Sequence, residues 1–184
     1  MKQMEYASPV GRITLVSDSG ALIGAWIEGQ KYFAATLQEE PETDPHDPVL
    51  GRAAAWLDDY FAGKKPAVSD LPLQPRGSAF RQEVWKLLCE IPYGETVTYG
   101  DLADKIAAAR GVKRFSAQAV GGAVGHNPIS IIIPCHRVVG ANGSLTGYAG
   151  GIARKVALLK HEGALTDRMY VPEKAQHCKG GTQS

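Results

Sequence analysis

Three short apolar runs separated by turn residues open the chain. The runs cover residues 4–7, 11–16 and 21–27. The segments between them carry residues typical of turns, Ser8-Pro9 and Asp18-Ser19-Gly20. Short apolar runs divided in this way are typical of β-strands joined by tight turns. The pattern therefore predicts an antiparallel β-meander within residues 2–28.

Helical spacing replaces this pattern after residues 38–47, an acidic, proline-bearing stretch that we expect to be an exposed loop. From Pro48 to about Ala62, apolar residues recur three and four positions apart: Leu50, Ala53, Ala54, Leu57, Tyr60 and Phe61. This spacing predicts a helix, and the glycine that follows it is a usual residue at a helix end. Residues 64–77 then hold three prolines and are expected to be a linker.

The second half of the chain begins with three predicted helices. Ser78 can cap the first, whose apolar face consists of Phe80, Val84, Leu87, Leu88 and Ile91. Thr98 and Asp101 have the spacing of a capping box, which predicts a second helix over about residues 99–109. A third opens near Ser116, after a basic turn at residues 110–114. Two helices joined by a short, glycine-bearing turn are typical of a helix-turn-helix.

An apolar run, Ile131 to Ile133, leads into Pro134-Cys135-His136. Proline cannot donate to a sheet and favours an extended residue before it. We therefore expect a strand to end at Ile133 and a turn to carry Cys135 and His136. In a strand these two side chains would point to opposite faces, whereas on a turn both can line one pocket.

A second turn signal follows. Asn142-Gly143 lies between the short runs 137–139 and 144–146, which predicts a β-hairpin. This hairpin would be the wing of a winged-helix domain.

The last predicted helix covers residues 152–161, with Ile152, Val156 and Leu159 on its core face. Glu162 comes at its end. An anion is unfavourable at a helix C-terminus, so we expect this carboxylate to have a cationic or hydrogen-bonding partner. From Ala164 onward the chain is polar and is expected to be a frayed tail.

Composition narrows the class of protein. The chain has 184 residues, of which 44% are hydrophobic and 21% charged, as in an ordinary soluble protein. No apolar stretch approaches the ~20 residues of a membrane helix, and the start lacks the apolar segment of a signal peptide. The three cysteines, Cys89, Cys135 and Cys178, form no CxxC pair. This usage indicates reduced thiols and a cytoplasmic location.

The two halves of the chain differ in charge. Residues 1–75 carry six Lys and Arg against eleven Asp and Glu, whereas residues 76–184 carry fourteen against eight. A basic half is compatible with binding to a phosphate backbone. The same bias is also typical of an ordinary solvated surface.

The adjacent Cys135 and His136 are the candidate catalytic pair. A thiolate is a strong nucleophile, and a nearby imidazole is a usual means of forming one at neutral pH. The alternative is an inert, buried cysteine beside a surface histidine, because free cysteine is often a small core residue.

Pro134-Cys135-His136-Arg137, with Asn127-Pro128 before it and Gly147-Tyr148-Ala149-Gly150-Gly151 after it, resembles the active-site segment of the O6-alkylguanine–DNA alkyltransferases. The resemblance runs from about Phe80 to Gly163. It implies an α+β fold in which an N-terminal meander and helix, ribonuclease-H-like, precede a mainly helical winged helix-turn-helix domain. It also implies repair of alkylated DNA with one turnover per molecule.

On this resemblance, residues 1–75 form a support domain, residues 76–163 form the DNA-binding and alkyl-transfer domain, and residues 164–184 form a polar tail. Some members of the family carry a structural zinc in the first domain. The ligands of such a zinc are not visible in this sequence, so we expect neither a metal nor another cofactor.

The resemblance also implies roles for the reacting groups. Cys135 would accept the alkyl group, His136 would take its proton through a water molecule, and Glu162 would orient the imidazole. Tyr99 would donate a proton or a hydrogen bond toward a ring nitrogen of the leaving guanine. Asn127 would be a hinge that ties the end of the second helix of the helix-turn-helix to the reactive turn; a plain helix cap is the simpler reading.

Further residues would hold the substrate base. The backbone N–H of Ala149 would face O6, and the carbonyls of Cys135 and Val138 would read the exocyclic amine. Tyr148 belongs to the flexible loop beside the site. Many relatives have serine in place of Ala149, but a backbone contact does not depend on that side chain.

The DNA partner would be a duplex bound through its minor groove by the second helix of the helix-turn-helix. This helix is rich in small residues, including Ala119, Gly121 and Gly122. Glycine lowers helix stability by ~1 kcal/mol relative to alanine, so the pair requires a reason. Close helix packing inside the protein is one reason, and close approach of DNA is the other.

Flipping the target nucleotide out of the duplex costs a few kcal/mol, ~2–4. Many members of the family fill the gap with an arginine, where this chain has Gln118. Glutamine can occupy the gap but lacks charge.

Arg114 or Arg110 would supply phosphate contacts, and Ser116 and Arg137 are the other expected DNA-binding residues. The protein is expected to be monomeric, with no membrane partner.

Two other function classes fit the sequence less well. A non-catalytic protein that binds alkylated DNA would keep this scaffold but carry another residue at the cysteine position, so Cys135 argues against it. A cysteine hydrolase or phosphatase would surround its cysteine with a glycine-rich phosphate cradle. Pro134-Cys135-His136-Arg137-Val138 has no such cradle.

Overall fold

The computed structural model describes residues 1–173, which begin with a twisted sheet. Strands β1 (Lys2–Ser8), β2 (Gly11–Asp18) and β3 (Ala21–Ile27) form an antiparallel meander, which confirms the prediction. A two-residue strand, β4 (Glu42–Thr43), pairs parallel to β1 and completes the order β3-β2-β1-β4. Part of the expected exposed loop is thus the edge of the sheet, although both β4 residues remain exposed.

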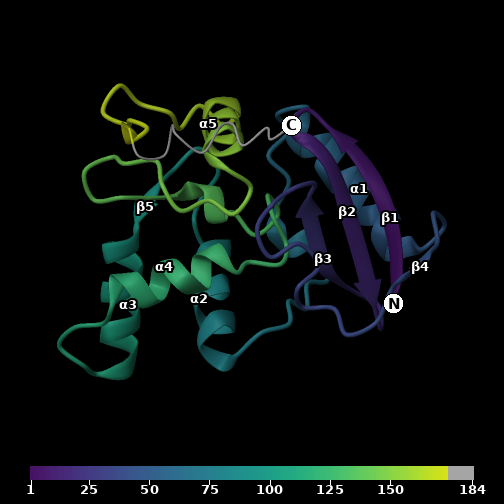
Figure 1. Cartoon of the computed structure of the whole chain (residues 1–184), viewed down its shortest axis with the longest axis horizontal. Coiled ribbons are helices and arrows are strands. Elements are labelled where there is room, and N and C mark those ends of the chain that lie inside the picture. Colours follow the sequence, from purple (N-terminus) through teal and green to yellow (C-terminus); the bar gives the residue numbers. More distant parts are fainter. Residues whose placement is uncertain (174–184) are drawn as a thin grey trace, which may run out of the picture.

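Helix α1 (Pro48–Phe61) covers one face of this sheet (Figure 1). The side chain of Asp47 accepts hydrogen bonds from the backbone N–H groups of Val49 and Leu50, at 3.0 and 2.9 Å, and so caps the helix. The apolar face of α1 is buried, as its spacing predicted, and contributes Val49, Leu50, Ala53, Trp56, Leu57 and Tyr60.

The predicted linker is attached to the sheet rather than loose. It contains a 3-10 turn, η1 (Val68–Asp70), and a buried Leu71. The N–H of Leu22 donates to the carbonyl of Pro72 at 2.8 Å, and the N–H of Gln74 donates to the carbonyl of Leu22 at 2.9 Å. The linker therefore extends the sheet beyond β3 before it enters the second half of the chain.

Helices α2 (Ala79–Cys89), α3 (Tyr99–Arg110) and α4 (Ala117–Gly125) occur where they were predicted. The side chains of Ser78, Thr98 and Ser116 cap them, and Thr98 and Asp101 form the expected capping box. Gly111 ends α3 with φ of 66°, a left-handed conformation that glycine adopts without strain. Local sequence signals thus account for the helix-turn-helix.

The predicted strand at Ile131–Ile133 is wrong. These residues form a compact, buried turn in which Ile131 has φ of 71°. The N–H of Ile133 bonds to the carbonyl of Ile129 at 3.0 Å, and the N–H of Ser130 bonds to Ala25 of β3 at 2.8 Å. An apolar run that is buried on every side has no strand alternation, so its pattern did not distinguish a strand from this turn.

The predicted hairpin at Asn142-Gly143 is also wrong in its pairing. A turn is present, closed by the N–H of Gly140 bonding to the carbonyl of Ser144 at 2.9 Å. However, β6 (Val138–Val139) pairs parallel with β5 (Val97–Thr98), not with residues 144–146. Ser144 instead forms a bridge with Tyr170 near the end of the described chain.

Helix α5 (Ile152–His161) has the predicted bounds, but its buried residues are Lys155, Leu158 and Leu159. Ile152 and Val156 are only half-buried. The segment after it is not frayed at its start. Ala164, Met169 and Val171 pack with Val139, Leu145 and Leu159 in a small cluster. Cys178 lies outside the described residues.

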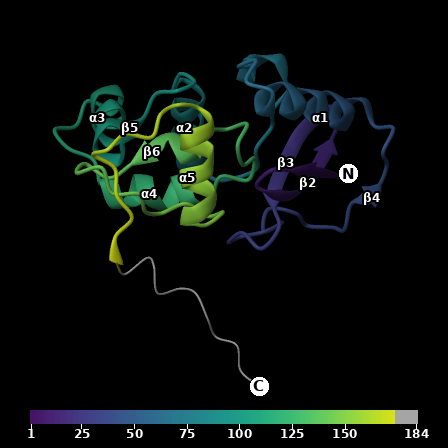
Figure 2. The same cartoon turned by 90° about the horizontal axis from the view of Figure 1, so that it is seen from above.

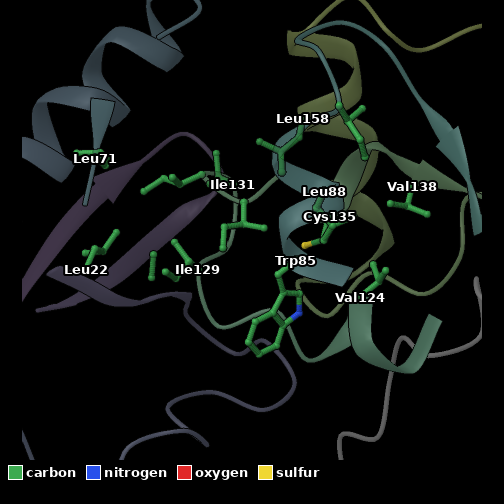
Figure 3. Packing of buried hydrophobic residues seen from close by; sticks show 14 of the residues in the cluster. Leu22, Leu71, Trp85, Leu88, Val124, Ile129, Ile131, Cys135, Val138 and Leu158 are labelled. Atoms are coloured by element: carbon green, nitrogen blue, oxygen red, sulfur yellow. The ribbon is translucent and has the colours of Figure 1, made fainter. Parts of the chain in front are cut away.

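One core joins the two halves of the chain. The sheet and α1 lie on one side of the molecule and α2 to α5 on the other (Figures 1 and 2). Figure 3 shows Ile129 and Ile131 between Leu22 on the sheet side and Leu88 and Cys135 on the helical side, all in one buried cluster. The turn that carries Cys135 is therefore held by both halves. Within residues 1–173, no helix is long and apolar enough to cross a membrane.

Candidate active site

Cys135 and His136 lie in a 3-10 turn, η2 (Cys135–Arg137), as predicted. Asn127, which follows the C-terminus of α4, fixes this turn. Its Nδ2 lies 2.8 Å from the carbonyl oxygen of Ile133 and 3.1 Å from Sγ of Cys135, and its Oδ1 accepts from the N–H of Ile129 at 3.0 Å. The amide therefore satisfies backbone groups that would otherwise be buried without partners.

Glu162 and His136 form the centre of a buried polar network. Nε2 of His136 lies 2.7 Å from Oε1 of Glu162, and both side chains are fully buried. Arg137 donates from Nε to Oε2 at 2.8 Å and from its Nη2 to Oε1 at 3.0 Å. The hydroxyl of Tyr60 donates to Oε1 at 2.7 Å, and the N–H of Gly94 donates to Oε2 at 3.3 Å. The partner expected for Glu162 is thus present.

The protonation states follow from these contacts. Burial by itself would raise the pKa of Glu162, but the hydrogen bonds from His136 and Arg137 and the charge of the Arg137 guanidinium outweigh it and lower this pKa. Burial lowers the pKa of His136, against the effect of Glu162, so the imidazole is neutral. Because a carboxylate can only accept, Nε2 carries the proton. Nδ1 is then a free acceptor, and it is buried without a hydrogen bond among the described residues.

Cys135 is held as a thiol. Burial raises its pKa above the ordinary value, although Asn127 and the charge of Lys155 act in the opposite direction. Nζ of Lys155 donates to the carbonyls of Val138 and Thr146 at 2.5 and 2.9 Å. Burial lowers the pKa of this lysine to about 8. The sulfur therefore needs a base to remove its proton, and it lies near a buried cation that favours the resulting thiolate.

Tyr99, the first residue of α3, reaches the same region as Cys135. Its hydroxyl donates to the carbonyl of Thr146 at 3.1 Å, and burial raises its pKa to about 12. Gly147 has φ of 76°, and a Cβ there would lie 2.7 Å from the Tyr99 oxygen. Glycine at this position is thus required for the hydroxyl to lie where it does, as a protonated donor.

The loop that follows is tied to the N-terminal half. The N–H of Lys31 donates to the carbonyl of Ala149 at 3.0 Å. Arg154 donates to the carbonyls of Val10 and Gly150, at 2.8 and 3.2 Å. Tyr148 is buried, and its ring packs edge-on against His136 with centroids 6.5 Å apart. This loop is therefore a fixed wall of the site rather than a free segment.

The outer surface of α4 presents almost no side chain. Gln118, Ala119 and Gly122 are exposed, and a Cβ added to Gly122 would meet nothing within 4 Å. A Cβ at Gly121 would meet only the Tyr99 ring, at an ordinary 3.6 Å. Internal packing thus does not explain Gly122, because the protein leaves room for a larger residue there.

The basic residues do not all lie on this surface. Arg114 is exposed, and Ser116 is exposed while its side chain caps α4. Arg110 is paired with Glu83 at 2.5 Å and lies over the Phe115 ring. Arg137 was expected to contact DNA, but this is wrong: it is buried, and its guanidinium is paired with Glu162.

Two buried residues of the site, Tyr60 and Lys155, were not predicted from the sequence. Tyr60 lies on the apolar face of α1 and cannot be distinguished there from a core aromatic residue. Lys155 has a detectable signal, because a lysine falls one turn after Ile152 on the face predicted to be buried. Within the described part of the chain, no group of three or more His, Cys, Asp or Glu residues is placed to hold a metal ion.

Comparisons with known proteins identify the family of the chain. Residues 1–75 match the family model of the 6-O-methylguanine DNA methyltransferase ribonuclease-like domain, and residues 79–164 match that of its DNA-binding domain. The chain is 46% identical to a methylated-DNA–protein-cysteine methyltransferase of Mycobacterium tuberculosis over 155 residues, which are 84% of this chain and 88% of that protein. The protein of the same name from Haemophilus influenzae is 42% identical over 159 residues, 85% of this chain and 83% of that protein.

Solved structures have the same fold. The structure of Mycobacterium tuberculosis OGT in complex with DNA has a TM-score of 0.77 and 43% identity, and the match covers 92% of this chain and 95% of that one. An O6-methylguanine-DNA methyltransferase from Pyrococcus kodakaraensis has a TM-score of 0.63 and 25% identity, covering 88% of this chain and 98% of that one. The α+β fold class is therefore confirmed, and the chain belongs to the 6-O-methylguanine DNA methyltransferase family.

Proposed function

We propose that this protein repairs O6-alkylguanine in DNA by transferring the alkyl group irreversibly to Cys135, once per molecule. The observation that carries the proposal is the buried Cys135 turn beside a neutral His136, whose Nε2 is held by Glu162 and whose Nδ1 remains an acceptor. This is the nucleophile, base and orienting group of a triad. The family's methyltransferase name and the DNA complex of a relative agree with it.

The transfer step uses these groups in order. His136 takes the thiol proton at Nδ1 through a bridging water, since a buried polar atom of this kind is usually satisfied by water. The thiolate attacks the alkyl carbon, a sulfur–carbon bond forms, and the bond from that carbon to O6 breaks. The electron pair moves into the purine, and the Tyr99 hydroxyl gives its proton to a ring nitrogen, so that neutral guanine departs. The Tyr99 phenolate then takes a proton from water, and the His136 imidazolium releases the former thiol proton to water. The charge of Lys155 favours the thiolate throughout.

Base recognition uses backbone groups of the same turn and loop. The N–H of Ala149 faces O6, and the carbonyls of Cys135 and Val138 accept from the exocyclic amine. Both carbonyls already accept one hydrogen bond, from the N–H of Val138 and from Lys155 respectively. A carbonyl oxygen has two lone pairs, so each retains capacity for the base.

Duplex DNA is bound through the minor groove by α4. The exposed Ala119 and Gly122 support this, because they form a smooth surface without side chains that read bases. Gln118 occupies the gap left by the flipped nucleotide, and Arg114 contacts phosphate. Residues 1–75 support residues 76–163, and the protein acts as a monomer in the cytoplasm. O4-alkylthymine is expected as a second substrate.

Intact mass measurement tests the proposal. Incubation with an oligonucleotide that carries O6-methylguanine is expected to add one methyl group per chain, and no more at longer times. Cys135→Ala is expected to gain none, whereas Cys89→Ala, which removes the half-buried thiol of α2, is expected to react like the wild type. Binding of the oligonucleotide without a gain in mass would instead support the non-catalytic DNA-binding alternative.

A further inference from the structure

The N-terminal half contributes one side chain to the polar network of the active site. Tyr60, near the end of α1, lies 102 positions before Glu162, yet its hydroxyl donates to Oε1 at 2.7 Å. Nε2 of His136 donates to the same oxygen at the same distance. All three side chains are buried. This oxygen therefore accepts from both halves of the chain: from Tyr60 in the first, and from His136 and, at 3.0 Å, Nη2 of Arg137 in the second.

The position of the Tyr60 hydroxyl is fixed by its surroundings. The ring stacks on Trp56 with centroids 5.6 Å apart and planes 7° apart, and it meets Phe61 edge-on at 5.0 Å. Its backbone carbonyl lies 2.8 Å from Nε2 of His161. A rigid aromatic ring loses little freedom when its hydroxyl forms a hydrogen bond. The contact with Glu162 is thus built into the packing of α1 against the second half.

A hydrogen-bond donor at Oε1 weakens the effect of Glu162 on the proton affinity of His136. The carboxylate stabilises the imidazolium form by its negative charge. A hydrogen bond from Tyr60 draws electron density from the oxygen that faces Nε2, and the Arg137 guanidinium neutralises the remaining charge. Both effects reduce the proton affinity of His136. The other titratable groups that face this site are Cys135, Tyr148, Lys155, Tyr93 and His161.

We propose that Tyr60 is a positioning residue for alkyl transfer, which acts through Glu162 to keep His136 neutral and oriented as the base. The inference rests on the proposed function for its catalytic consequence, but the effect on His136 is independent of any substrate. It assigns the N-terminal half a role in reactivity in addition to mechanical support. A comparable hydrogen bond without a partner in the His136 network is present on the same helix, where Asp58 accepts from Tyr6 of β1 at 2.7 Å.

Tyr60→Phe tests this, with Tyr6→Phe as the matched control. Each variant loses one hydroxyl that donates to a carboxylate, and each keeps its aromatic ring, so both are expected to fold. The apparent pKa of His136 is followed by NMR of its labelled imidazole in the protein without DNA. We expect Tyr60→Phe to raise it by roughly half a pH unit or more and Tyr6→Phe to leave it unchanged. Equal titration of His136 in Tyr60→Phe and wild type would overturn the proposal.

A second readout uses the single-turnover rate of methyl transfer between pH 5 and 8. Because neutral His136 is the base, Tyr60→Phe is expected to react roughly two- to five-fold more slowly near pH 6 and almost normally at pH 8. A uniform loss at every pH would indicate a structural defect and count against the proposal. If the wild type itself transfers no methyl group, the proposed function fails, while the NMR titration still decides the role of Tyr60.

Discussion

Glu162 is the residue on which the buried polar groups around His136 converge. Its two oxygens accept from Tyr60, His136, Arg137 and the N–H of Gly94. A buried ion pair adds little net stability, but removing one partner leaves the other charge buried without compensation. Glu162 therefore has two roles: it orients His136 for the proposed reaction, and it balances the buried charge of Arg137 in the fold.

Glu162→Gln is expected to be destabilising at neutral pH. The Arg137 guanidinium would lose its counter-charge, at a cost of about 3–5 kcal/mol in the free energy of unfolding. Urea unfolding at pH 7 measures this. Glu42→Gln is the control, since Glu42 forms an exposed pair with Lys2 and its loss should hardly change the unfolding midpoint.

The pH dependence of stability has a definite sign at the same residue. The folded-state pKa of Glu162 is lowered, so its contribution is fully present above its unfolded pKa of about 4.3 and is lost as the pH falls below that value. Wild type should therefore lose stability steeply between about pH 4 and 2, where Glu162→Gln should lose less. Parallel curves for the two proteins would contradict this assignment.

At the scale of elements, α4 contains an exposed glycine, Gly122, that does not favour the stability of the helix. Gly122 lies inside the helix at an exposed position where a Cβ would meet nothing within 4 Å. An alanine there would favour the helix. The glycine is explained if something outside the chain approaches this surface closely, and the minor groove of DNA is the proposed neighbour.

Gly122→Ala separates the effect of this position on protein stability from its effect on DNA binding. It should stabilise the free protein by about 0.5–1 kcal/mol and weaken binding to duplex DNA, because the added methyl group lies between α4 and the groove. Thermal unfolding and a fluorescence titration with DNA measure the two effects. Gly51→Ala is the matched control, since Gly51 of α1 is also exposed with nothing within 4 Å. Similar stabilisation with no change in DNA affinity for both variants would argue against α4 as the DNA-binding surface.

At the scale of the whole molecule, the reactive turn lies where the two halves meet. Ser130 and Pro128 bond to Ala25 of β3, while Asn127 joins the end of α4 to Cys135. A change in volume at Sγ therefore acts on both halves at once. The sulfur lies 3.1 Å from Nδ2 of Asn127, and the residue is 5% exposed, so an added methyl group must displace neighbouring atoms.

Methylation of Cys135 is accordingly expected to loosen the fold. Overpacking of a core costs about 1–3 kcal/mol, which corresponds to a fall in melting temperature of roughly 2–10 °C for a chain of this size. The comparison is between wild type before and after reaction with an O6-methylguanine oligonucleotide. Cys135→Ala, carried through the same incubation, controls for the DNA. Equal melting temperatures would show that the site accepts the methyl group without strain.

Local signals were sufficient for most of the fold. The meander, α1 and the three capped helices were predictable because periodicity, turn residues and caps are encoded within a few positions. The pairing of β6 with β5 was not, because Val97 and Val138 are 41 positions apart and each strand has two residues. The turn at Ile131–Ile133 was missed because complete burial removes the alternation that identifies a strand.

The features of the site also divide into those that the sequence predicts and those that only the structure shows. The sequence by itself determined that Cys135 and His136 share one turn, that Glu162 requires a partner, and that the active-site segment resembles a known family. Only the tertiary structure decided which partners Glu162 has, paired Arg137 with Glu162 inside the protein, and brought Tyr60 and Lys155 to the site. The physical reason is that proton affinity depends on burial and on charges a few ångströms away. These are set by residues that are distant in the chain and meet only in the folded core.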